Sequence, residues 1–306
     1  FLPARPCKNA PCCYNDGGNQ QTRKDGCGMA LYKMGEILAD AQARGYGVGF
    51  FNTINLEMIR ACVEAAEELN SPVIIGTAEA LLPIAPFDWL VPAMLEAARR
   101  AKVPVAVHLD HTYRFDTLMQ ALRSGFGSIM YDGTRESLED NVRHSAEIAR
   151  IAHAMGVGLE CELGSVAGLT DEAGNEDKMV YTDPAGAASF LERTGADFLA
   201  VSIGTAHGVY KAKPCLDIPR LKQIRAVVDA PLVLHGGSGL SDDDFRNTIK
   251  GGIAKVNVFT DVILAGKRAL AENPEAGYTD GVCLAREAMK RAVTEKLDLF
   301  GSAGKA

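Results

Sequence analysis

Eight short runs of β-branched and other apolar residues recur along the chain, and longer amphipathic segments separate them. Parallel strands need crossover connections that return the chain to the same edge, so this alternation predicts βαβ units. Eight such units in about 250 residues favour a closed (β/α)8 TIM barrel over an open doubly wound sheet. The predicted strands are residues 47–51, 72–76, 104–109, 127–131, 157–163, 198–203, 231–235 and 254–258.

The segments between these runs carry helical signals. Apolar side chains recur with helical spacing over residues 56–69, 88–101 and 137–155. Asp183 followed by proline is typical of an N-cap, and Ser241 followed by three aspartates indicates another helix start.

The chain is predicted to form one barrel domain over residues 29–306, because no linker rich in Pro, Gly or Ser interrupts residues 30–300. Residues 1–28 are different: they lack apolar periodicity and also the apolar core of a signal peptide. Their cysteines could mark a small disulfide or zinc module, but we favour an appended leader ahead of a start at Met29. These cysteines are Cys7, Cys12, Cys13 and Cys27.

Composition limits the function classes. The net charge is −7 and no cluster of Lys and Arg exceeds two residues, which argues against a nucleic-acid partner. No stretch approaches about 18 consecutive apolar residues, so no transmembrane helix is expected. The remaining cysteines are predicted to be core thiols of a reducing compartment, which indicates a cytoplasmic protein; they are Cys62, Cys161, Cys215 and Cys283.

Polar residues gather where the predicted strands end, and the loops on that side of a barrel carry function. His111, His207 and His235 follow the third, sixth and seventh runs. A lone histidine at a strand end is more often a hydrogen-bonded core residue. Three on one rim, with the carboxylate of Asp110 nearby, favour a catalytic zinc site with an open position.

The stretch VHLDHT, residues 107–112, holds two histidines. In a regular strand His108 and Asp110 face one side and His111 faces the other. One metal ion cannot easily bind both histidines while the strand stays regular. We therefore predict that His111, past the strand end, turns toward the metal and that His108 is a buried support.

Two glycine-rich loops indicate phosphate binding. HGGSG (235–239) and GTAHG (204–208) expose backbone N–H groups with little side-chain obstruction, and Lys211 could add a positive charge. Glycines also serve tight turns, so either motif alone would be weak. Residues 164–183 exceed the usual length of a loop between strand and helix, and their Gly and acidic content predicts a mobile lid.

Longer motifs extend these observations: HLDHT (108–112), ECELGSVAG (160–168), YTDPAGA (181–187), AVSIGTAHGVYK (200–211), LDIPRL (216–221), PLVLHGGSGL (231–240) and KVNVFTD (255–261). In this order they resemble the zinc-dependent class II ketose-bisphosphate aldolases, the fructose- and tagatose-bisphosphate group. The similarity extends from about Tyr32 to Ala292. Motifs of this length are highly specific for the superfamily.

The resemblance implies an aldolase that reversibly cleaves a ketose 1-phosphate or ketose 1,6-bisphosphate into dihydroxyacetone phosphate and an aldehyde. It implies Asp110 as the catalytic acid and base and Asn257 as the residue that contacts the enediolate. Positions that match zinc ligands are His111, His207 and His235. Glu162, with Glu160 as a second candidate, matches carboxylates associated with alternative metal positions.

The resemblance also implies further ligands and an assembly. The cradle for the phosphate of dihydroxyacetone phosphate would comprise Gly208, Lys211, Gly236, Ser238 and Thr260. Carbonyl groups near Gly208 and Gly236 resemble the family's site for a monovalent cation, Na⁺ or K⁺. The family relationship favours a homodimer or homotetramer that acts on a small sugar phosphate.

Several positions depart from the family pattern. Leu169 and Thr170 stand where many members carry an acidic pair on the lid, with Asp171 and Glu172 just beyond. Ile263 and Gly281 stand where arginines for the distal phosphate are expected, and Phe259 replaces a small or acidic residue. Neither Ile nor Gly can make a charge-assisted contact with phosphate. We therefore expect an intact donor-phosphate half and an altered distal half.

Two other functions stay open from the sequence. A zinc barrel hydrolase commonly has an H-x-H pair on its first strand, but this chain has GVGFFNTIN there. A barrel that has lost catalysis and only binds a sugar phosphate would agree with the altered lid and distal positions. The aldolase is the preferred prediction.

Overall fold

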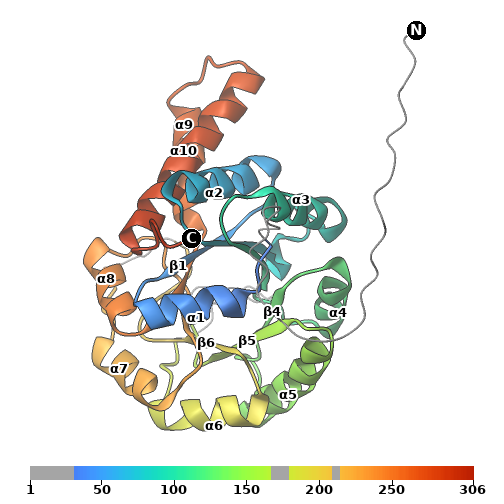
Figure 1. The fold of residues 1–306 in the computed structure, drawn as a ribbon, viewed down its shortest axis with the longest axis vertical. Coiled ribbons are helices and arrows are strands. Elements are labelled where there is room, and N and C mark those ends of the chain that lie inside the picture. Colours follow the sequence, from blue (N-terminus) through green and yellow to red (C-terminus); the bar gives the residue numbers. More distant parts are fainter. Residues whose placement is uncertain (1–30, 167–178, 209–213) are drawn as a thin grey trace, which may run out of the picture.

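The computed structural model describes residues 31–166, 179–208 and 214–306. Within them, parallel strands pair in chain order and close into a barrel through the β8–β1 pair (Figure 1). The TIM-barrel prediction is confirmed. The strands are β1 (Val48–Asn52), β2 (Val73–Ala78), β3 (Val105–Asp110), β4 (Ser128–Tyr131), β5 (Gly158–Leu163), β6 (Phe198–Val201), β7 (Leu232–Leu234) and β8 (Ile253–Val258).

The predicted helices are present, and α2 coincides with the predicted range 56–69. Asp183 caps α6 by accepting the N–H of Gly186, and Ser241 forms a capping box with Asp244 at α8. The α-helices are α1 (Met34–Arg44), α2 (Leu56–Leu69), α3 (Phe87–Arg100), α4 (Phe115–Ser124), α5 (Leu138–Ala154), α6 (Pro184–Thr194), α7 (Ile218–Val227), α8 (Asp242–Lys250), α9 (Thr260–Ala271) and α10 (Tyr278–Leu299), and one 3-10 turn is η1 (Glu79–Leu81).

Buried apolar side chains fill two spaces. One cluster lies between the outward faces of the strands and the surrounding helices. The other fills the amino-terminal half of the barrel interior, and α1 lies across that end of the barrel and contributes to it (Figure 1). The carboxyl ends of the strands are therefore the end left for a site. The second cluster comprises Met34, Ile37, Leu38, Ala41, Tyr46, Val48, Phe50, Ile74, Ala106, Phe198, Ala200, Val233 and Ala254.

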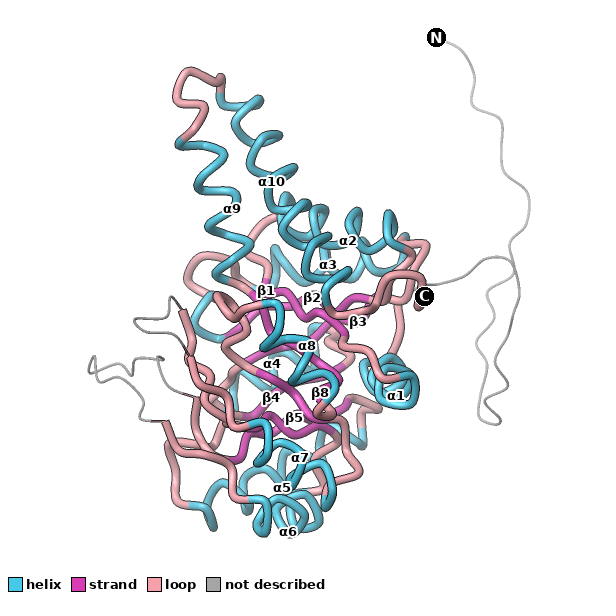
Figure 2. The backbone as a smooth tube through the Cα atoms, turned by 90° about the vertical axis from the view of Figure 1, so that its left-hand side faces the viewer, coloured by secondary structure: helices cyan, strands magenta, loops and turns pink. Residues whose placement is uncertain are grey.

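Helices α9 and α10 continue the chain after β8 and extend together beyond the barrel as a hairpin (Figure 2). The part of α10 near its end packs against α2. None of the helices in the described part of the chain is long and apolar enough to cross a membrane.

Three sequence-based predictions fall outside the described residues. They concern the segment 1–28, Lys211, and the lid positions 169–172. At the described ends of the predicted lid, Ser165 and Val180 form an antiparallel bridge.

Candidate metal centre and active site

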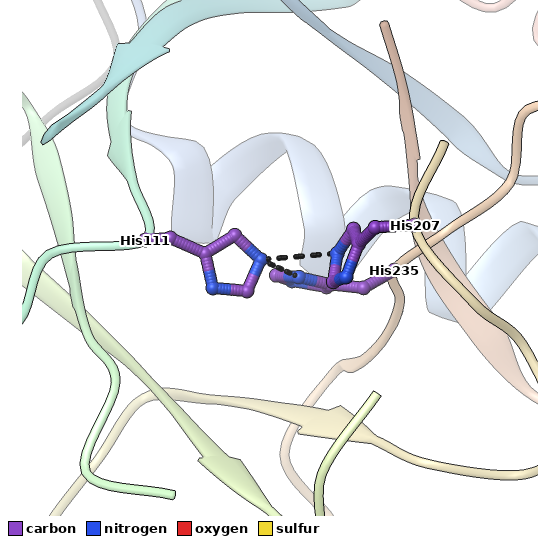
Figure 3. Close-up of side chains that lie close together, drawn as sticks. All are labelled: His111, His207 and His235. Atoms are coloured by element: carbon purple, nitrogen blue, oxygen red, sulfur yellow. Dashed lines mark hydrogen bonds between the residues drawn. The ribbon is translucent and has the colours of Figure 1, made fainter. Parts of the chain in front are cut away.

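Three histidine rings meet at the carboxyl end of the barrel (Figure 3). His111 follows β3, His207 lies after β6 and His235 follows β7 directly. Nε2 of His111 lies 3.2 Å from Nε2 of His207 and 2.7 Å from Nδ1 of His235. The structure thus brings together the three histidines that the sequence singled out, with one nitrogen of each directed at a common centre.

The outer nitrogens of two of these rings face carboxylates. His111 donates from Nδ1 to Asp132 over 2.8 Å, and His235 donates from Nε2 to Glu160 over 2.9 Å. A carboxylate only accepts, so each bond places the proton on the outer nitrogen and directs the lone pair of the inner nitrogen at the centre. Histidines that bind metals are usually oriented in this way.

The charge around the centre suits a cation. Burial alone would lower the pKa of His111, but the carboxylates of Asp110 and Asp132 raise it to about 10. Burial and the facing His111 lower the pKa of His207 to about 3, so that ring is neutral. The buried Nδ1 of His207 has no hydrogen-bond partner among the described residues. The surroundings therefore favour positive charge at a point where imidazole lone pairs converge, and the residues present fit a divalent metal ion.

Asp110 ends β3 and is buried beside the histidines. Its carboxylate accepts hydrogen bonds from the side-chain amides of Asn52, over 2.8 Å, and Asn257, over 3.0 Å. Burial alone would raise the pKa of Asp110, but the neighbouring His111 and His235 hold it well below its usual range. The carboxylate is therefore ionised and held in position by two amides.

A second charged group lies just beneath the histidines, inside the barrel. Lys255 and Glu160 are fully buried and their Nζ and Oε2 atoms lie 2.7 Å apart. Burial would raise the pKa of Glu160, yet Lys255 and the bond from His235 lower it to about 2. Glu160 therefore stays ionised, and it connects Lys255 to a histidine of the centre.

His108 lies in this layer and not in the histidine centre. Its Nδ1 is 2.9 Å from Oγ of Ser128, and its ring packs edge-on against Phe50. Burial and the nearby Lys255 lower its pKa to about 3. This arrangement agrees with the interpretation of His108 as a buried support.

Glu162 lies beside the histidine centre, in a second group of possible metal ligands with His111 and Asp132. Its carboxylate lies close enough to His111 and Asp132 for the three side chains to bind one metal ion. Its Oε2 is 4.0 Å from Nδ1 of His235. Burial and nearby Asp132 raise its pKa to about 8. Its buried Oε2 has no hydrogen-bond partner in the described part of the chain.

A cavity of about 320 Å³ opens above the centre. The Ser238 hydroxyl accepts hydrogen bonds from the N–H groups of Phe259 and Asp261, so the loop after β7 is joined to the start of α9. Gly236 has φ +67°, and a Cβ there would collide with the carbonyl oxygen of Ala206. The wall includes these predicted site residues: Asp110, His111, His207, Gly208, Gly236, Ser238, Asn257 and Thr260.

The positions where the family pattern has arginines for the distal phosphate lie outside the described cavity wall. Ile263 packs against the core on α9, and Gly281 lies on α10; neither belongs to the described wall of the cavity, although Phe259 does. The sequence reading also missed Asn52 and Asp132. Both end or directly follow predicted strands, so applying the strand-end rule to every strand would have found them.

Comparisons with known proteins show the family of this chain. The family model described as fructose-bisphosphate aldolase class-II matches residues 32–305. The chain belongs to the class II fructose-bisphosphate aldolase family. It is therefore an aldolase, a carbon–carbon lyase, of a family that is generally metal-dependent and acts on sugar phosphates. Membership in this family argues against the two alternative functions, a zinc barrel hydrolase and a barrel that has lost catalysis.

Relatives of this aldolase cover nearly its whole barrel. A fructose-bisphosphate aldolase of Thermus caldophilus is 42% identical over 300 residues, which span 89% of this chain and 98% of the relative. The crystal structure of the YdjI aldolase from Escherichia coli K12 is 37% identical, with a TM-score of 0.83, and the match covers 90% and 99% of the two chains. A putative fructose-1,6-bisphosphate aldolase from Coccidioides immitis, 31% identical, has the same TM-score and covers 89% and 97%.

Proposed function

We propose that this aldolase is zinc-dependent and reversibly cleaves a ketose 1-phosphate or ketose 1,6-bisphosphate into dihydroxyacetone phosphate and an aldehyde. The observation that carries the proposal is the convergence of three imidazole nitrogens beside an ionised, amide-held carboxylate. Three imidazole nitrogens with an open position are the donor set of catalytic zinc.

His111, His207 and His235 would hold the metal, and Glu162 would offer an alternative ligand with Asp132. When bound, a divalent metal ion would supply Lewis acidity at the C2 oxygen of the ketose, where negative charge gathers as the C3–C4 bond breaks. Asp132 and Glu160 keep two of the imidazoles in the required orientation.

Asp110 would act on the hydroxyl group at C4. Its low pKa keeps it ionised at neutral pH, and it would accept the C4 hydroxyl proton during cleavage and return it in condensation. Asn52 and Asn257 donate to separate oxygens of this carboxylate and prevent it from rotating. Asn257 also lines the cavity and would contact the substrate on the side of C2 and C3.

The donor phosphate would bind above β7 and β8. Gly208 and Gly236 line the cavity without side chains, and the N-terminus of α9 at Thr260 favours an anion. Ser238 and Lys211 would complete the cradle, and carbonyl groups near Gly208 and Gly236 would take Na⁺ or K⁺. This places the phosphate where barrels commonly bind one.

We also propose a homodimer or homotetramer in the cytoplasm. The assembly follows from the family resemblance. The location is supported by the free thiols of Cys62 and Cys161 inside the core, which suit a reducing compartment. Cys215 and Cys283 are also free, but they are exposed and not core residues as predicted.

The test combines metal analysis with a partial reaction. The purified protein should retain about one zinc ion per chain and should exchange a C3 proton of dihydroxyacetone phosphate with deuterated water. A chelator should abolish exchange, Zn²⁺ should restore it, and His207→Ala should lose both metal and exchange. Exchange that survives complete removal of metal would contradict the zinc mechanism. An exposed helix arginine, Arg143, provides the control variant Arg143→Leu.

A further inference from the structure

Lys296, near the end of α10, pairs with a carboxylate at the start of α9. Its Nζ lies 2.8 Å from Oδ2 of Asp261, the second residue of α9. Both side chains are largely shielded from solvent, with exposed fractions of 16% and 26%. Helices α9 and α10 lie side by side (Figure 2), so α10 brings a positive charge to the N-terminus of α9.

Asp261 is joined twice to the glycine-rich loop after β7. Its N–H donates to Oγ of Ser238 and its Oδ2 accepts the N–H of Gly239, each over 3.4 Å. The oxygen that pairs with Lys296 is therefore the one that also bonds to this loop. The ion pair connects α10, the start of α9 and the loop after β7 at one point.

The Lys296 ammonium is held in place by an aromatic ring beneath the same loop. It lies 4.6 Å from the centroid of the Phe245 ring, which is a cation–π contact. Phe245 also packs under the loop, since a Cβ at Gly237 would lie 3.3 Å from its ring. The ring thus keeps the positive charge close to the loop and to Asp261.

The proposed phosphate cradle lies beside this carboxylate. Ser238 bonds to Asp261 and Thr260 precedes it in the chain, and both line the cavity. Neither Asp261 nor Lys296 belongs to the described cavity wall. Without a partner, the carboxylate would repel a phosphate bound to these neighbours, and such repulsion near a protein surface changes affinity by about tenfold.

We propose that Lys296 is a positioning residue for the phosphate of dihydroxyacetone phosphate. By pairing with Asp261 it neutralises the carboxylate beside the cradle and holds the start of α9 against the loop after β7. Lys296 acts through Asp261 and not through contact with the substrate. This inference rests on the proposed function, because that function supplies the position of the phosphate.

The experiment measures the Kd of dihydroxyacetone phosphate for the zinc-loaded protein by calorimetry, without an aldehyde. Lys296→Met should raise this Kd by about tenfold at low salt, since it leaves the carboxylate unpaired. The increase should shrink at about 1 M salt, where the Debye length is about 3 Å. Lys296→Arg should keep the Kd of the unaltered protein, and zinc content should not change in either variant.

The double variant of Lys296→Met with Asp261→Asn separates charge from structure. The new amide oxygen can still accept the N–H of Gly239 but carries no charge, so the Kd should return to that of the unaltered protein. Lys290→Met is the matched control, because Lys290 lies on the same helix, is 18% exposed and pairs with Glu68 over 2.7 Å outside the described cavity wall. It should leave the Kd unchanged.

Two results would overturn the role of Lys296. One is an unchanged Kd in Lys296→Met, and the other is a Kd in the double variant as high as in the single one. Failure of the proposed function gives a different result: dihydroxyacetone phosphate would bind to the unaltered protein, but its C3 proton would not exchange.

Discussion

The amino-terminal half of the barrel interior is filled by apolar side chains and closed by α1, whereas the carboxyl half holds carboxylates, imidazoles and a buried lysine. The same strands supply both halves. Phe50 and Asn52 lie on β1, two residues apart, and only the second contacts the catalytic candidate Asp110. The change from apolar to polar side chains in the barrel interior therefore occurs within two residues of β1.

The two halves of the barrel interior contribute differently to the free energy of folding. Burial of apolar surface in the lower half stabilises the barrel by about 25 cal/mol per Å². The upper half opposes folding unless every charge has a partner, since an unpaired buried charge is costly. We infer that the lower half carries stability and the upper half carries chemistry, and four variants test this division.

The largest effect is expected for Asp110→Asn. Loss of the general acid and base should lower kcat for cleavage by about 10²- to 10⁴-fold. Stability should change little, because the buried Oδ1 atoms of Asn52 and Asn257 lack partners and either amide can turn to accept from the new side chain. Steady-state kinetics, zinc content and urea unfolding give the comparison. A kcat within tenfold of the unaltered protein would remove Asp110 from the mechanism.

The next variant, Lys255→Met, breaks the charged network beneath the centre. It leaves Glu160 buried without its cation, and such a loss costs about 3–5 kcal/mol. The double variant Lys255→Met with Glu160→Gln removes both charges and should recover most of this stability. Urea unfolding of the two variants measures the coupling. Equal stabilities for the single and double variants would show that the pair is not a unit.

Leu38→Ala changes the lower half only. Leu38 lies on α1, fully buried in the interior cluster, and its truncation should lower the free energy of unfolding by about 2–5 kcal/mol. Because the cluster lies at the opposite end from the cavity, kcat of the folded variant should match that of the unaltered protein. A fall in kcat that parallels the fall in stability would contradict the division of the two halves.

The fold could be predicted because its signals are local. Each strand and helix is encoded by the spacing of apolar residues within one segment, and caps such as Asp183 are read from adjacent residues. The rim histidines could be found for the same reason, since strand ends share one face of a barrel.

The partners in the site could not be predicted, because they depend on how neighbouring strands are aligned. Asp132 could be found as a strand-end residue, but its bond to His111 depends on how β4 aligns with β3. Lys255 reaches Glu160 only once β8 and β5 face each other across the barrel interior. Ile263 and Gly281 stand where the family pattern has arginines for the distal phosphate, and neither lines the described cavity.

The smallest effect is expected at the boundary between the halves, for His108→Asn. The new amide can keep the bond to Ser128, but it leaves part of the space beside Phe50 unfilled, so stability should fall by about 1–3 kcal/mol. Zinc content should not change if His108 is a support and not a ligand. His207→Ala, which removes a proposed ligand, provides the contrast in the same metal analysis. Loss of zinc from His108→Asn would move the metal to the group formed by His108, Asp110 and Glu160, and the boundary between stability and chemistry would then lie one layer deeper in the barrel.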